Sequence, residues 1–131
     1  MRTAIGTFGG SLKDMPAPNL GAIAIRAAVA RAGLRPEDVE TVVMGNVIQA
    51  GNKMNPARQA AVHAGLPVTT PALTVNRVCG SGAQAIVSAA QEILLGNVDV
   101  AAARRHGEYG PRALFDGARP LGIPHGRRPT L

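Results

Sequence analysis

The sequence predicts a layered α/β fold with a mostly parallel sheet and helices on both faces. Short segments rich in β-branched residues alternate with segments of helical period, which is typical of βαβ units. Hydrophobic residues make up 46% of the 131 residues but aromatic residues only 2%, so alanine and aliphatic side chains must form the core. Residues 41–48 form a continuous apolar run, which indicates a strand buried on both faces of a parallel sheet. The length suits one domain.

The first part of the chain predicts a helix, a turn and a strand. Asn19 is the expected N-cap of a helix over residues 19–32, and Gly33 is the expected stop. Pro36 suits the first position of a short helical turn. The strand over residues 41–48 follows this turn.

The second part of the chain continues the alternation. After a loop, Asn55 and Pro56 are expected to cap and start a helix that ends at Gly65. Residues 73–78 predict a strand, residues 83–95 a helix and residues 98–103 a last strand. Such an order favours right-handed crossovers and parallel pairing.

The net charge of +6 is concentrated at the C-terminal end. Residues 1–103 contain eight Lys/Arg and six Asp/Glu, whereas residues 104–131 contain six Arg and two acidic residues. From Arg104 onward arginine, glycine and proline dominate and the periodicity ends, so residues 104–131 are expected to form a disordered tail. Because the rest of the chain is nearly balanced in charge, the sequence does not favour a nucleic-acid partner.

Other function classes are also disfavoured. No apolar run approaches the length of a membrane span, and the N-terminus shows no signal-peptide pattern. A single cysteine excludes an intrachain disulfide and is typical of a reducing cytoplasm, where we expect the protein to act. One cysteine and three scattered histidines do not have the spacing of a metal site.

Cys79 lies where the predicted strand changes into the predicted helix. Gly80 and Gly82 are expected to let the backbone turn sharply between the two. A thiol at a helix N-terminus is placed where free N–H groups favour the thiolate. A lone cysteine is more often a buried, inert side chain. The strand–Cys–Gly–Ser–Gly–helix context instead favours a catalytic nucleophile.

Residues 76–82, Asn-Arg-Val-Cys-Gly-Ser-Gly, resemble the nucleophile segment of the thiolases, in the acetyl-CoA acetyltransferase branch. Residues 2–12, 43–47 and 55–61 resemble further thiolase blocks in the same order. The resemblance runs nearly continuously to about Ala103. It implies the N-terminal half of the thiolase-like layered αβα fold, a partial domain over residues 1–103. The family's first strand is missing, so an unpaired slot is expected in the sheet.

The resemblance also implies a chemistry. Cys79 is the expected catalytic nucleophile that takes the acyl group from acyl-CoA, and its N–H is one expected oxyanion donor. Coenzyme A thioesters are the expected substrates. No further cofactor, no nucleic-acid partner and no membrane are expected, and the full-length parent is expected to be a homo-oligomer. The family's histidine, second cysteine and asparagine-held water come from its C-terminal half, so the isolated chain is expected to be inactive.

The remaining candidates are three histidines, an arginine and a glutamine. His63 is expected at the surface or in an interface rather than in catalysis. Arg58 and Gln59 could mark a subunit interface near the active site, as the matching thiolase block does, or Arg58 could lie on a solvated helix face. His106 and His125 lie in the tail and take no family role.

Two alternative functions stay open at this point. A β-ketoacyl synthase relative would share the fold and a cysteine at a helix start, although the blocks around Asn55 and Cys79 favour a thiolase. A small basic protein could bind nucleic acid through its arginine tail.

The tail itself has a specific interpretation. Residues 104–110 can be encoded by CGG CGG CAT GGA GAA TAT GGA. Read from the second base, these codons give Gly-Gly-Met-Glu-Asn-Met, which is how thiolases continue after this strand. We therefore interpret the tail as a frame-shifted reading of a thiolase gene.

Overall fold

The computed structural model describes residues 1–107, which alternate between helices and strands as the sequence predicts. The elements are, in chain order, α1 (Ala17–Arg31), the 3₁₀ helix η1 (Pro36–Asp38), β1 (Thr41–Gly45), α2 (Pro56–His63), β2 (Ala72–Val75), α3 (Ser81–Leu94) and β3 (Ala101–Arg105). The predicted α/β class is confirmed.

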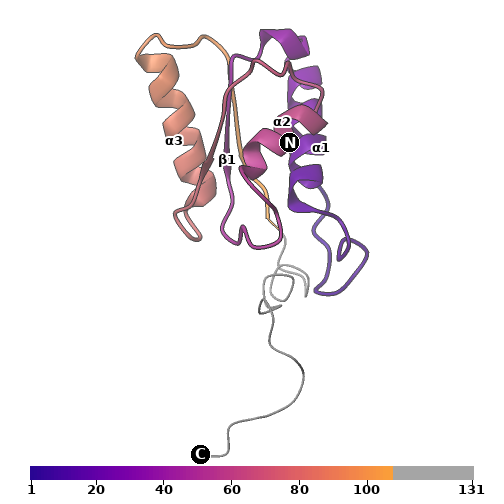
Figure 1. Ribbon diagram of the computed structural model, residues 1–131. Helices are drawn as coiled ribbons and strands as arrows, with labels where there is room; N and C mark the ends of the chain where they lie inside the picture. Colours follow the sequence, from indigo (N-terminus) through magenta and orange to yellow (C-terminus); the bar gives the residue numbers. More distant parts are fainter. Residues whose placement is uncertain (108–131) are drawn as a thin grey trace, which may run out of the picture.

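The described strands form one parallel sheet in the order β2-β1-β3. Val43 in the central strand lies opposite Leu73 of β2 and Ala103 of β3. Helices α1 and α2 lie on one side of the sheet and α3 on the other (Figure 1). Strand β1 is buried from Val42 through Gly45, as expected for a strand covered on both faces.

The expected unpaired slot in the sheet is absent from residues 1–107. β1 and β3 pair directly over their full length, from Thr41 opposite Ala101 to Gly45 opposite Arg105. Unpaired backbone groups in the middle of a sheet are costly, and direct pairing of the two strands satisfies them. The prediction of a slot between them was wrong.

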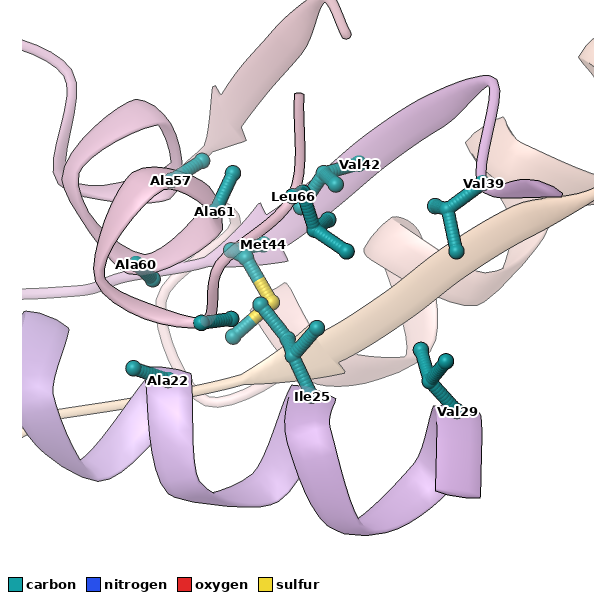
Figure 2. Close-up of a cluster of buried hydrophobic side chains, with 11 residues drawn as sticks. Ala22, Ile25, Val29, Val39, Val42, Met44, Ala57, Ala60, Ala61 and Leu66 are labelled. Carbon is teal, nitrogen blue, oxygen red and sulfur yellow. The ribbon is translucent and has the colours of Figure 1, made fainter. Parts of the chain in front are cut away.

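The two faces of the sheet pack differently. The α1/α2 face carries the larger core, in which side chains from both helices surround Met44 of β1 (Figure 2). This cluster consists of Ala22, Ile25, Val29, Val39, Val42, Met44, Ala57, Ala60, Ala61, Ala64 and Leu66. The α3 face has a smaller cluster of Val43, Ala85 and Ala89. Small alanines on α3 let this helix approach the sheet closely.

The three α-helices of residues 1–107 end in the same hydrogen-bonded motif. After α1, the N–H of Gly33 bonds to the carbonyl oxygen of Ala30 and that of Leu34 to Val29. This pair of bonds is the Schellman motif, which needs a left-handed residue, and Gly33 has a φ of 69°. Gly65 ends α2 and Gly96 ends α3 in the same way. The predicted stops at Gly33 and Gly65 are confirmed.

The helix starts agree with prediction at α2 but not at α1. Asn55 caps α2, since its side chain accepts a hydrogen bond from the N–H of Arg58 at 3.2 Å. Helix α1 begins at Ala17 after Pro16, two residues before the predicted cap. Pro18 fits this first turn because helix N–H groups there have no partner within the helix. The prediction that Asn19 is the N-cap was wrong.

The strand ends also differ from the predicted ones. β1 and β2 stop at Gly45 and Val75, each three residues early, while β3 continues through Arg104 and Arg105. β3 reaches this far because all five of its residues find a partner on β1. The rest of the predicted tail, residues 108–131, lies outside the described residues. Within residues 1–107 no helix is long and apolar enough to cross a membrane.

Candidate active site

Cys79 lies in the segment that joins the end of β2 to the start of α3. Helix α3 begins at Ser81, two residues earlier than predicted, and Gly80 is its N-cap. Cys79 therefore immediately precedes the cap residue, and it is a free, exposed cysteine. The carboxyl end of a parallel sheet, where β2 leads into this segment, is the edge at which open α/β sheets bind ligands. The alternative of a buried cysteine is wrong.

The sharp turn before α3 occurs at Val78 and not at a glycine. Val78 has a φ of 48°, whereas Gly80 has a φ of −80°. For a β-branched residue the left-handed region is a genuine outlier, with a cost on the order of 1–3 kcal/mol. The prediction that Gly80 provides the sharp turn was therefore wrong. Its lack of a side chain instead allows close approach, because a β carbon there would lie 3.3 Å from the carbonyl oxygen of Arg77.

Side chains on both sides of Cys79 hold this turn. The Asn76 Oδ1 atom accepts the N–H of Val78 at 3.0 Å, and its Nδ2 donates to the carbonyl oxygen of Val47 at 2.9 Å. The Ser81 hydroxyl accepts the N–H of Arg77 at 2.8 Å and donates to the carbonyl oxygen of Val78 at 2.6 Å. Asn76 thus ties the turn to the segment after β1, and Ser81 ties it to α3.

Asn76 and Ser81 are the site residues that sequence reasoning left without a role. Asn76 forms an Asx-turn, in which an asparagine side chain binds the N–H two residues later. Serine is typical of helix starts. Both signals were present in the sequence, but the partner of the Ser81 hydroxyl could not be read from it.

Gly82 has a packing role that the sequence did not reveal. A β carbon at this position would lie 3.1 Å from the β carbon of Arg105, at the end of β3. The first turn of α3 can therefore rest against the sheet next to the turn that carries Cys79. This close approach, together with the Ser81 bonds, fixes where the thiol lies relative to the sheet.

His63 is exposed at the end of α2, which confirms its predicted surface position. Its Nδ1 atom lies 2.8 Å from Oδ1 of Asn19, and its carbonyl oxygen accepts a hydrogen bond from Arg26 at 2.6 Å. Both partners belong to α1. His63 therefore connects the two helices and makes no hydrogen bond to the turn that carries Cys79.

Arg58 and Gln59 fasten the loops on either side of α2. The Arg58 guanidinium donates to the carbonyl oxygens of Val68 and Thr70, in the segment leading to β2. The Gln59 amide donates to the carbonyl oxygens of Asn52 at 2.6 Å and Met54 at 2.8 Å. Arg58 is half-buried, so the prediction that it could lie on a solvated helix face was wrong. A subunit interface at this helix stays a prediction.

His106 is buried, with 4% of its surface exposed, although it falls in the segment predicted to be a tail. Its N–H bonds to the carbonyl oxygen of Gly45 at 3.0 Å. Its ring packs on α1, where a β carbon at Gly21 would lie 2.8 Å from Nδ1. Burial lowers the pKa of His106 to about 4, so its ring is neutral at pH 7. It belongs to the core, and His125 lies outside the described residues.

The comparisons with known proteins agree with one another. Residues 1–104 match the family model of the thiolase N-terminal domain. The chain is 55% identical over 102 residues to an acetyl-CoA acetyltransferase of Cupriavidus necator, which covers 78% of this chain and 26% of that protein. It is 61% identical over 102 residues to a beta-ketothiolase of the same organism, covering 77% and 26%.

A solved structure is similar as well. The crystal structure of the Bacillus anthracis acetyl-CoA acetyltransferase matches with a TM-score of 0.77 and 43% identity, over 80% of this chain and 27% of that chain. The chain thus spans about a quarter of the length of these relatives. Because the family model covers nearly all of the described fold, including the strand–turn–helix unit around Cys79, this chain belongs to the thiolase family.

Proposed function

We propose that this chain carries the acyl-accepting cysteine of a thiolase-type acyltransferase, which makes or cleaves a carbon–carbon bond beside a thioester. The observation that carries the proposal is the exposed thiol of Cys79 on a strained turn between β2 and α3. Strained backbone of this kind gathers at active sites, where it orients a reacting group. The names of the similar proteins, acetyl-CoA acetyltransferase and beta-ketothiolase, support this chemistry.

The acyl-transfer step follows from thiol chemistry. The Cys79 thiolate attacks the carbonyl carbon of an acyl-CoA and forms a tetrahedral intermediate with a negatively charged oxygen. The N–H of Cys79 donates a hydrogen bond to that oxygen. The bond between the carbonyl carbon and the CoA sulfur then breaks. CoA leaves as a thiolate, which takes up the proton that Cys79 lost, and the acyl group remains on Cys79.

The second half of the reaction also needs an acid/base group. Attack on the acyl-cysteine by an enolate of acetyl-CoA forms the new carbon–carbon bond, and making the enolate requires an acid/base group. Cys79 is the only cysteine in the sequence, and the His63 ring is hydrogen-bonded to Asn19 of α1. We therefore expect one acyl transfer per chain, with no turnover in acetoacetyl-CoA thiolysis. The proposal includes a cytoplasmic, homo-oligomeric parent enzyme that needs only CoA thioesters.

Acetyl-CoA labelling tests the proposal. The chain is incubated with acetyl-CoA, and intact mass and peptide mapping locate any acetyl group. We expect one acetyl group on Cys79, removed by hydroxylamine at neutral pH because it is a thioester. Cys79→Ala is the matched control and should take up none. Acetylation that persists in Cys79→Ala, or no thioester at Cys79 in a chain whose thiol still reacts with iodoacetamide, would refute the proposal.

A further inference from the structure

Ser81 binds the carbonyl side of the peptide between Val78 and Cys79. The Val78 carbonyl oxygen accepts the Ser81 hydroxyl at 2.6 Å and the Ser81 N–H at 3.1 Å. The same hydroxyl accepts the N–H of Arg77 at 2.8 Å, so its one proton and one of its two lone pairs are in use. Ser81 is fully buried, which fixes the position of the hydroxyl.

This contact controls the direction of one particular N–H group. In a planar trans peptide the carbonyl and the following N–H point in opposite directions. Holding the Val78 carbonyl against Ser81 therefore directs the Cys79 N–H away from α3. The N–H groups of Gly80 and Ser81 are already bonded inside the turn, to the carbonyl oxygens of Arg77 and Val78. Neither of these two N–H groups can therefore bind a substrate in place of the Cys79 N–H.

We propose that Ser81 is a positioning residue that holds Val78 in its left-handed conformation and thereby aims the Cys79 N–H at the oxyanion formed during acyl transfer. Without the Ser81 hydroxyl, Val78 can relax toward negative φ, because a β-branched residue avoids the left-handed region. The Val78–Cys79 peptide then rotates, and the N–H turns with it. The role of Ser81 rests on the proposed acyl transfer, whereas its hold on the backbone does not.

Two reactions of the Cys79 thiol distinguish a correctly aimed Cys79 N–H from a thiol that is merely exposed. Acetyl transfer from acetyl-CoA passes through an oxyanion, while alkylation by iodoacetamide displaces iodide at a saturated carbon and forms none. In Ser81→Ala we expect acetyl transfer to Cys79 to slow by roughly tenfold or more, since loss of an oxyanion donor costs roughly 10²–10³ in rate. Alkylation should stay within about twofold of the unsubstituted chain, as the thiol stays exposed. Ser81→Thr retains a hydroxyl and should recover much of the acetyl transfer.

A stability cycle tests the hold on the backbone independently. Glycine adopts positive φ without strain, so in a Val78→Gly background the Ser81→Ala substitution should cost less unfolding free energy than it costs with Val78 present. If Ser81→Ala costs the same unfolding free energy in both backgrounds, Ser81 does not hold Val78 in its left-handed conformation. Equal slowing of acetylation and alkylation in Ser81→Ala would overturn the positioning role. If the unsubstituted chain is alkylated but never acetylated, the proposed acyl transfer fails, and with it the catalytic purpose of Ser81, while the cycle still decides the backbone role.

Discussion

Gly45, the last residue of β1, lies directly against the backbone of Ser81, the first residue of α3. A β carbon at position 45 would lie 2.5 Å from the carbonyl oxygen of Ser81 and 2.6 Å from its carbonyl carbon. Real β carbons do not approach backbone atoms so closely. The lack of a side chain at Gly45 therefore allows α3, and the turn that carries Cys79, to rest on the central strand.

We expect Gly45→Ala to destabilise the chain by about 2 kcal/mol or more, because the contacted atoms are backbone and cannot move without shifting α3. Urea unfolding followed by circular dichroism measures this. Gly107→Ala is the matched control, since a β carbon there would meet nothing within 4 Å, and it should leave stability nearly unchanged. Equal stability of the two variants would contradict this account of the contact.

His106 should make the stability of the chain depend on pH. In the unfolded chain its ring has an ordinary pKa near 6.5, whereas burial lowers the pKa to about 4 in the folded chain. Between these values the unfolded state binds more protons, so stability is full above about 6.5 and falls as the pH drops toward 4. The complete shift corresponds to about 3 kcal/mol.

Unfolding titrations at several pH values, on the unsubstituted chain and on His106→Leu, measure this contribution. The two proteins differ only at position 106, so the difference between the two curves isolates His106. We expect that difference to change between pH 6.5 and 4. A difference that stays constant across this range would show that His106 is not held in its neutral form.

The outer face of α3 should cause the chain to self-associate. Ile86, Ile93 and Leu94 are 59%, 43% and 85% exposed, while the sheet-facing side of the helix buries Ala85 and Ala89. Large apolar side chains exposed on one helix favour association. Sedimentation velocity should show concentration-dependent oligomers that the double substitution Ile86→Lys, Leu94→Lys reverts to monomer.

Val62→Lys, which adds the same charge at an exposed apolar position of α2, is the control for that experiment and should leave the oligomers in place. A chain that stays monomeric at all concentrations would refute the prediction. So would dissociation by Val62→Lys to the same extent.

The DNA that encodes the residues after Ala103 should contain a thiolase sequence in a second reading frame. Translation from the second base of the Arg104 codon is expected to give Gly-Gly-Met-Glu-Asn-Met and then a longer thiolase-like continuation. Resequencing the gene around this codon and translating all frames decides the question. Unrelated residues or early stops in every other frame would remove the frame-shift interpretation.

Local sequence patterns were enough to predict the order of the elements and the place of the cysteine. Alternating periods predict helices and strands because side-chain spacing along one segment decides which face it can bury. Gly33 and Gly65 could be predicted as helix stops because the left-handed residue of a Schellman motif is a local requirement. Cys79 could be placed between a strand and a helix for the same local reason. Its family, seen in the motif, is confirmed by the match over residues 1–104.

The contacts between distant segments became visible only in the folded molecule. The direct pairing of β1 with β3, the burial of His106 against Gly21, and the contact of Gly45 with Ser81 all join residues far apart in the chain. No local pattern encodes such contacts, because their energy appears only when several elements pack together. The left-handed Val78 belongs to this class as well. A β-branched residue disfavours that conformation. Hydrogen bonds to Asn76 and to Ser81, which is buried against the sheet, stabilise it nonetheless.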